Sequence, residues 1–303
     1  MIGAVDIGGT KIAVGMVDGD GQVLAQAECP THPERGFDDA LERISTLLRA
    51  TQAQTGGIMR GIGIGCTGPV YPLTGTIGDV EFLPGWENVN IVKALSREFS
   101  LPVALENDAD AATMGESAWG AGRNVGVFIY VTVSTGIGGG IALDGRIYRG
   151  VDGAHPEIGH HVIDPSGPAC FCGAHGCWES LASGRAMAQW FRDNAPDGMT
   201  SLASIDAREI CSRSDPYAQA VIAREGYYLG LGLANLVTMF VPNVIALGGG
   251  LMHSRHLFWG AIQQIIQSSC GYAPHQKVRL VPASLGADVG LIGAAQAWVQ
   301  HFG

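Results

Sequence analysis

Three glycine-rich segments of this chain suit the binding of phosphate groups. They are Asp6-Ile7-Gly8-Gly9-Thr10-Lys11, Ser134-Thr135-Gly136-Ile137-Gly138-Gly139-Gly140 and Gly248-Gly249-Gly250. Glycine lets backbone N–H groups turn toward an anion without obstruction by a side chain. Asp6 would repel a bare phosphate, but it suits a hydrated Mg²⁺ that is already bound to phosphates. One such segment alone would be an ordinary turn, whereas three in one chain favour a nucleotide site.

Two other phosphate-binding motifs are excluded by the sequence. The chain contains no G-x-x-x-x-G-K-[ST] segment, so it is not a P-loop protein. The segment 63–68 matches G-x-G-x-x-G after an apolar run. However, Pro69 and Pro72 follow where the dinucleotide fingerprint requires a helix, so this segment is not a dinucleotide site.

A polar cluster, Glu106-Asn107-Asp108-Ala109-Asp110, follows the apolar run 103–105. Polar residues at the carboxyl end of a strand often form an active site. An Asp there can take the proton from an attacking sugar hydroxyl, and Asn107 can bridge two sugar hydroxyls as donor and acceptor. The same residues would serve equally as an acidic N-cap for a helix beginning near Ala111. The pattern leaves both interpretations open.

A second cluster has the spacing H-x9-C-x-C-x4-C and consists of His160, Cys170, Cys172 and Cys177. Three thiolates and one imidazole are the ligands of a closed, tetrahedral, structural zinc site. Buried or redox-active cysteines are the alternative, but the close spacing in an irregular segment favours zinc. Other histidines nearby leave the choice of imidazole open, namely His155, His161 and His175.

Two carboxylates, Glu157 and Glu179, lie close to this segment on either side. They are either ordinary surface groups or acceptors for sugar hydroxyls that the zinc loop holds in position.

The bulk composition is that of a folded, acidic, intracellular protein. The 303 residues suit two domains, and 47% hydrophobic against 15% charged residues predict packed cores. A net charge of −10 without any Lys/Arg run argues against nucleic acid and anionic membranes. The odd count of seven cysteines and the absence of a signal peptide predict a cytoplasmic location. The uncharged stretch 227–253 is not a membrane span, because Pro242 and three glycines interrupt it.

Alternating strands and helices that position these residues predict an α/β protein. Strands are expected at 3–6, 12–17, 23–28, 61–65, 103–105, 127–133, 141–143, 146–148, 244–247 and 278–281. Helices are expected at 37–54, 89–99, 184–194, 207–212, 218–241, 256–269 and 286–299. The order strand, glycine turn, strand, Asp-Gly turn, strand occurs near residues 3–28 and again near 127–148, with 134–140 as the second glycine turn. This repetition favours an internal duplication over coincidence.

Taken together, these motifs resemble the ROK family, which comprises bacterial glucokinases, fructokinases, N-acetylhexosamine kinases and sugar-responsive repressors. The resemblance runs nearly end to end. It implies the two-domain actin-like (ribonuclease H-like) sugar kinase fold, with an interdomain cleft. The smaller domain would comprise residues 1–112 plus 286–303, since the last helix returns to it. Residues 113–285 would form the larger domain, with the zinc loop and a dimerisation surface.

The resemblance also implies a role for each matching residue, with Asp108 as the catalytic base. The implied sugar ligands are Gly68, Asn107, Asp108, Glu157, His160 and Glu179. The implied nucleotide ligands are Asp6, Gly8, Gly9, Thr10, Lys11, Ser134, Thr135, Gly136, Gly248 and Gly249. The implied zinc ligands are His160, Cys170, Cys172 and Cys177. The expected partners are therefore ATP, Mg²⁺, structural Zn²⁺, a hexose and a second copy of the chain, with neither nucleic acid nor membrane.

The substrate is less sharply implied than the reaction. Thr67-Gly68 and the V-S-T-G of residues 133–136 are similar to N-acetylmannosamine kinases, whereas 106–109 and 177–179 are similar to glucokinases. The 6-hydroxyl of glucose is the favoured acceptor, with N-acetylmannosamine, N-acetylglucosamine or another aldohexose as the alternative. Repressors of the family carry an N-terminal helix-turn-helix, and no room for one is expected before the strand that begins at residue 2. A non-catalytic sugar-binding protein is the remaining alternative.

Overall fold

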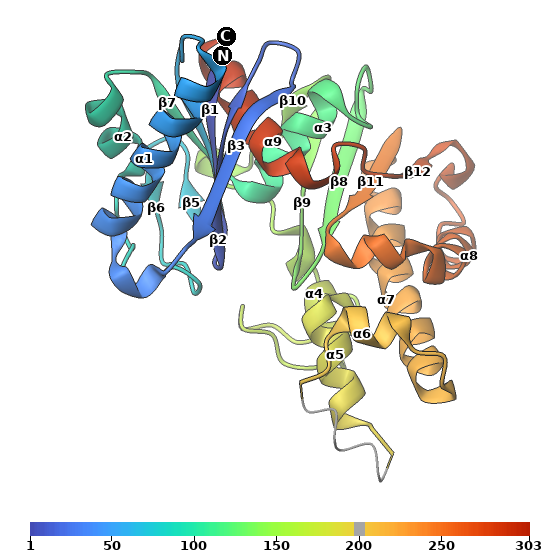
Figure 1. Ribbon diagram of the computed structural model, residues 1–303. Coiled ribbons are helices and arrows are strands. Elements are labelled where there is room, and N and C mark those ends of the chain that lie inside the picture. The colour runs from blue at the N-terminus through green and yellow to red at the C-terminus, as the bar shows by residue number, and fades with distance from the viewer. Residues whose placement is uncertain (197–203) are drawn as a thin grey trace. The chain divides into compact units, whose positions relative to one another are not determined.

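The computed structural model describes residues 1–196 and 204–303 (Figure 1). These residues divide into two compact units. Unit 1 contains Met1–Gly126, Gly140–Pro156 and Ala283–Gly303, and unit 2 contains Val127–Gly139 and Glu157–Pro282. The expected break after residue 112 would fall inside a helix that continues to Trp119. The limits of the folded domains stay a prediction.

Unit 1 is built on a five-stranded sheet in the order β3-β2-β1-β4-β7. Its strands are β1 (Ile2–Ile7), β2 (Lys11–Val17), β3 (Val23–Pro30), β4 (Ile62–Cys66) and β7 (Val103–Asn107). The first three are antiparallel neighbours, and β1, β4 and β7 run parallel. The parallel strands therefore end at the same edge of the sheet. Asp6, Cys66 and Asn107 lie at these strand ends.

Helices cover this sheet and bury its apolar side chains. They are α1 (Phe37–Thr55), α2 (Ile91–Phe99), α3 (Asp108–Trp119) and α9 (Val289–Phe302). A short hairpin of β5 (Val70–Tyr71) and β6 (Thr76–Ile77) follows β4. Helices α3 and α9 pack backbone to backbone, since a Cβ at Gly293 would lie 2.2 Å from the Ala111 carbonyl oxygen. Glycine at 293 thus permits the close approach of α9 to the first turns of α3. The two helices lie side by side in Figure 1.

The second sheet has the order β10-β9-β8-β11-β12, which repeats the order of the first. Its strands are β8 (Val127–Val133), β9 (Ile137–Leu143), β10 (Arg146–Ile147), β11 (Val244–Gly248) and β12 (Arg279–Pro282). If the strands of each sheet are numbered by their order in the chain, both sheets have the spatial order 3-2-1-4-5. In both, strands 1, 4 and 5 are parallel to one another. The shared topology supports the predicted duplication.

The predicted glycine turn 134–140 is wrong in its extent. Strand β9 already begins at Ile137, so the turn comprises only Ser134, Thr135 and Gly136. At Gly139 and Gly140 in this strand, neighbouring atoms leave no space for a side chain. A Cβ at Gly139, for example, would lie 2.3 Å from both the Ile158 side chain and the Tyr130 carbonyl oxygen.

The helices of unit 2 are α4 (Trp178–Ala182), α5 (Gly184–Asp193), α6 (Ala207–Ser212), α7 (Pro216–Phe240) and α8 (Trp259–Ser269). The predicted helix 256–269 begins later than expected, because Gly250–Leu257 forms a 3₁₀ helix before it. Trp178 is buried and donates its indole N–H to the Tyr228 carbonyl at 3.0 Å. Within the two described ranges, no helix is both long and apolar enough to cross a membrane.

Candidate active site

The turn between β1 and β2 is tightly organised by backbone and side-chain hydrogen bonds. Gly8 donates its N–H to the Lys11 carbonyl at 2.9 Å. The buried Thr31 donates its hydroxyl to the Gly8 carbonyl at 2.6 Å. A Cβ at Gly9 would lie 2.6 Å from the Cβ of Phe82, so only glycine fits there. The predicted first phosphate loop is therefore a rigid turn with little room beside it.

Asp6 lies next to Asp108, and the two carboxylates affect each other. The pKa of Asp6 is raised to about 6, first by burial and then by like-charge repulsion from Asp108, while Lys11 opposes both effects. Glycines make room for the Asp6 carboxylate, since a Cβ at Gly290 would lie 2.2 Å from its Oδ2. A pair of neighbouring carboxylates at strand ends suits a cation, which would relieve their repulsion.

The junction of β7 and α3 shows which residue caps the helix. Asn107 is the N-cap, and its Oδ1 accepts from Ala109 N at 2.9 Å and Asp110 N at 3.2 Å. The Asn107 amide oxygen therefore caps α3, and the bridging of two sugar hydroxyls by Asn107 stays a prediction. Its Nδ2 faces Gly68, where a Cβ would lie 2.9 Å away. Asp108 is partly buried at the first position of α3 and is not the cap.

In unit 2, the turn Ser134–Gly136 lies beside Gly248–Gly250. The Ser134 hydroxyl oxygen accepts the Gly250 N–H at 2.8 Å. Gly249 has a φ of 89°, and a Cβ there would lie 2.5 Å from the Val133 carbonyl oxygen. Glycine is required at 249 by this left-handed conformation and close approach. The structure thus joins the second and third predicted phosphate segments at the ends of β8 and β11.

Glu179, a predicted sugar ligand in the first turn of α4, contacts the same turn. Its Oε2 accepts the Ile137 N–H at 2.7 Å, and a Cβ at Gly136 would lie 2.3 Å from that oxygen. The carboxylate therefore ties α4 to the start of β9. Only Cys177 and Trp178 separate Glu179 from Gly176 of the cysteine-rich loop, so one short segment carries residues predicted for both the sugar site and the zinc site.

The four predicted zinc ligands gather in unit 2, and their ligand atoms all lie within 4.8 Å of one another. His160 Nδ1 is 3.4 Å from Cys170 Sγ, and Cys172 Sγ is 3.5 Å from Cys177 Sγ. Tetrahedral zinc with Zn–S bonds of about 2.3 Å separates its ligands by about 3.8 Å. The residues therefore fit this metal, and His160 is the histidine of the cluster. Glu157 precedes it with an exposed side chain.

A family model described as the ROK family matches residues 2–301. The chain belongs to the ROK family.

Relatives and solved structures agree with this assignment over nearly the full length. A glucokinase of Streptomyces coelicolor is 34% identical over 96% of this chain and 95% of its own. The ROK hexokinase of Thermus thermophilus superimposes with a TM-score of 0.84 at 35% identity, covering 99% of this chain and 98% of its own. A Streptomyces griseus ROK glucokinase, solved with glucose and AMPPNP, gives 0.82 at 31% identity, covering 97% of each chain. The predicted two-domain actin-like sugar kinase fold is confirmed.

The family also contains proteins with other names among the relatives of this chain. An N-acetylmannosamine kinase of Escherichia coli is 32% identical over 96% of both chains. A xylose repressor of Bacillus subtilis is 30% identical over 74% of this chain and 58% of its own.

Two residues beside the predicted ROK site belong to none of the motifs in the sequence. Phe82 packs on Gly9, and Arg149 pairs with Glu106 and Asp110 on either side of the Asn107-Asp108 dipeptide. No spacing rule signals these contacts, because each joins segments far apart in the chain. Lys11, predicted for the phosphate site, pairs with Glu28 at 2.9 Å on the surface, and its role toward phosphate stays a prediction.

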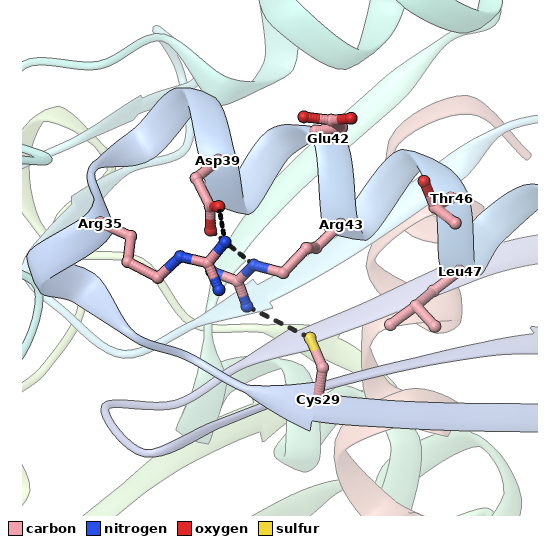
Figure 2. A pocket seen from close by; sticks show the side chains of 7 residues that line it. All are labelled: Cys29, Arg35, Asp39, Glu42, Arg43, Thr46 and Leu47. Carbon is pink, nitrogen blue, oxygen red and sulfur yellow. Dashed lines mark hydrogen bonds and ion pairs between the residues drawn. The ribbon is translucent and has the colours of Figure 1, made fainter.

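A hollow of about 290 Å³ in unit 1 lies between β3 and α1, and none of the predicted site residues lines it (Figure 2). Asp39 bridges Arg35 and Arg43 there, and Arg43 Nη1 lies 3.4 Å from Cys29 Sγ. Arg43 also donates to the Thr31 carbonyl at 2.7 Å. The hollow is thus lined by ion-paired side chains, and Arg43 links it to Thr31, which bonds the Gly8 carbonyl.

Proposed function

We propose that this chain is an ATP-dependent hexokinase that phosphorylates the 6-hydroxyl of glucose, with Asp108 as general base. The observation that carries the proposal is the position of Asp108 at the N-terminus of α3, beside Asp6, in a ROK-family chain. Named kinases of this family match nearly the whole chain, and one was solved with glucose and an ATP analogue.

On the side of the hexose, Asn107 rather than Asp108 is the N-cap of α3, so the Asp108 side chain is not needed as the cap. The Asp108 carboxylate accepts the Ala109 N–H at 2.8 Å, which holds it at the start of the helix. There it takes the proton as the hexose oxygen bonds to the γ-phosphorus. The bond from the γ-phosphorus to the β,γ-bridging oxygen breaks, and ADP leaves with that oxygen. The Asn107 amide N–H groups then serve as donors to the sugar, together with the turn at Gly68.

On the donor side, the two glycine turns are assigned to ATP. Gly9 in unit 1 and Gly136 in unit 2 have backbone N–H groups with no side chain of their own beside them. The N–H groups of Gly8 and Ser134 donate to the carbonyls of Lys11 and Gly136, at 2.9 Å each, and hold the two turns in shape. Mg²⁺ supplies charge neutralisation for the phosphates when it is bound. Asp6 is the carboxylate that would hold this ion, through its own oxygens or through ion-bound water.

The proposal includes one structural zinc ion held by His160, Cys170, Cys172 and Cys177. Four ligand atoms within 4.8 Å, three of them sulfur, support this assignment. The bound ion would fix the loop on which Glu157 and Glu179 depend, and both carboxylates are assigned to sugar hydroxyls. His160 would contribute to sugar and metal through different ring nitrogens.

Two other functions are weighed against glucose phosphorylation. An N-acetylhexosamine, N-acetylmannosamine in particular, is the alternative substrate, supported by Thr67-Gly68 and by the relative of that name. Sugar binding without catalysis is the second, supported by the repressor relative. A homodimer and a cytoplasmic location complete the proposal, and both rest on the family resemblance and on the sequence.

The test is ADP release from MgATP across glucose, mannose, fructose, glucosamine, N-acetylglucosamine and N-acetylmannosamine. We expect glucose to give the highest kcat/KM. A higher value for N-acetylmannosamine would make the alternative the substrate. Sugar binding in calorimetry without any ADP formation would overturn the kinase in favour of a sugar-binding protein.

A further inference from the structure

A closed cluster of four charged or titratable side chains lies beside the proposed base in unit 1. Glu106 comes from the end of β7, Asp110 from the first turn of α3, and Arg149 and His155 from the segment after β10. The carboxylates are 6% and 0% exposed, respectively. Charged groups this deeply buried are stable only when paired, so their partners are structurally decisive.

Arg149 pairs with both carboxylates through different nitrogens. Its Nη1 donates to Asp110 and its Nη2 to Glu106. A guanidinium has a rigid fork of donors, so two carboxylates bound to it are fixed relative to each other. Because Asn107 and Asp108 lie between these two carboxylates in sequence, the fork spans the junction that carries the proposed sugar ligand and base.

Asp110 also contacts His155, at the other end of the segment 149–155. His155 Nδ1 lies 3.0 Å from Asp110 Oδ1, so residues 149 and 155 meet at one carboxylate. Between them the chain makes a tight loop, closed by the Gly150 N–H donating to the Ala154 carbonyl at 2.8 Å. Glu157, an assigned sugar ligand, follows His155 by two residues.

Strand β9 has a glycine, Gly140, where it passes the Asp110 carboxylate. A Cβ at Gly140 of β9 would lie 2.6 Å from Asp110 Oδ1 and 2.5 Å from Thr113 Oγ1. A side chain at 140 would therefore displace the Asp110 carboxylate. The glycine-rich segment 134–140 therefore starts with the turn assigned to phosphate and ends with Gly140, which leaves space for the Asp110 carboxylate.

We propose that Arg149 is a positioning residue for hexose phosphorylation, which holds the β7–α3 junction and the loop 149–155 through Glu106 and Asp110. It does not touch the reacting atoms. The inference rests on the proposed function and adds a residue to it. Its consequence is specific to the acceptor: the hexose site should depend on Arg149, and the ATP site should not.

The test compares Arg149→Met with Arg149→Lys and with Arg146→Met, which removes the same charge from the exposed strand β10. Hexose affinity is measured by calorimetry without ATP, and KM for hexose and for ATP by ADP release. We expect Arg149→Met to raise hexose Kd and KM at least about tenfold, since two buried carboxylates lose their partner, with KM for ATP within about twofold. Arg149→Lys should recover part of this affinity, and Arg146→Met should match the wild type.

Two results would overturn the inference. One is a folded Arg149→Met protein with hexose affinity within about twofold of the wild type. The other is an equal loss of hexose and ATP affinity with a lowered Tm, which indicates general destabilisation. If Arg149→Met does not fold, Arg149→Lys decides: it keeps the charge but loses the two-pronged fork, and it must still show a weaker hexose affinity than the wild type with KM for ATP unchanged. If the wild type binds hexose but forms no ADP, the proposed function fails, while the calorimetric comparison still decides the role of Arg149.

Discussion

The Glu179 carboxylate accepts the backbone N–H of Ile137, with 2.7 Å between Oε2 and the nitrogen. This bond joins α4, which follows the cysteine-rich loop, to the first residue of β9, which follows the turn Ser134–Gly136. A residue assigned to the sugar therefore also fixes a turn assigned to ATP. Both substrates should depend on it.

We predict that Glu179→Ala raises KM for the hexose and for ATP. Loss of a charge-assisted hydrogen bond costs about 1.5–3 kcal/mol, so kcat/KM for each substrate should fall about 10–100-fold. Glu179→Gln, which keeps a neutral acceptor, should fall between the alanine variant and the wild type. The measurement is initial-rate kinetics with each substrate varied in turn. An unchanged KM for ATP in Glu179→Ala would disprove the link to the turn.

Thr31 provides the corresponding prediction for the first turn. It is buried, donates its hydroxyl to the Gly8 carbonyl at 2.6 Å, and receives the Arg43 guanidinium on its own carbonyl at 2.7 Å. Thr31→Val keeps the shape and removes one hydrogen bond, worth about 1 kcal/mol. We expect KM for ATP to rise about fivefold while the hexose Kd is unchanged.

The matched control is Thr46→Val, on α1 at the same hollow and exposed to solvent (Figure 2). It should behave as the wild type in both measurements. A Thr31→Val protein with an unchanged KM for ATP would show that the Gly8 turn does not need this support.

The pKa of Asp6 predicts a pH dependence of stability. Burial, aided by Asp108, raises it from 3.8 to about 6, so the folded state binds this proton more tightly than the unfolded chain. Wild-type stability is therefore lost relative to Asp6→Asn as the pH rises from about 4 through about 6, by up to about 3 kcal/mol. Urea unfolding between pH 4 and 8, without Mg²⁺ or nucleotide, measures this difference.

Asp20→Asn removes a carboxylate from an exposed turn and serves as the control for net charge. If the difference between wild type and Asp6→Asn were the same at pH 4 and pH 8, the raised pKa would be refuted.

Metal removal tests the zinc assignment. Freshly purified protein should contain about one zinc per chain, and Cys172→Ser should contain less than about half of one. Loss of the metal should lower Tm by at least about 4 °C and raise KM for the hexose, since the loop before Glu179 is released. Cys211→Ser, which alters a cysteine outside the cluster, should keep its zinc. A wild-type protein without zinc that is stable and active would contradict the assignment.

The local parts of the fold and site could be predicted from sequence, because they depend on short-range patterns. The strand and glycine turn at 3–17, the cysteine spacing and the polar residues after 103–105 all lie where they were expected. The extent of the second turn was overestimated. Glycine marks a close backbone approach as often as a turn, and Gly139 has its side-chain space taken by Ile158.

The remaining features depend on pairings between distant residues. Arg149 meets Glu106 across 43 positions, and Phe82 covers Gly9, so no window of sequence contains both partners. The capping role of Asn107 could also be recognised only from the structure. Its type and position fit a cap and a sugar ligand equally, and the bonds from Ala109 and Asp110 show that it is the cap, while its part in sugar binding stays a proposal.

The most direct test of the central claim is the turnover of Asp108→Asn with MgATP and saturating glucose, compared with its glucose Kd. A general base contributes about 10²–10⁴-fold, so kcat should fall by that factor while the glucose Kd stays within about threefold of the wild type. A variant that keeps more than about a tenth of wild-type kcat would contradict Asp108 as the base, and with it the mechanism proposed for this chain.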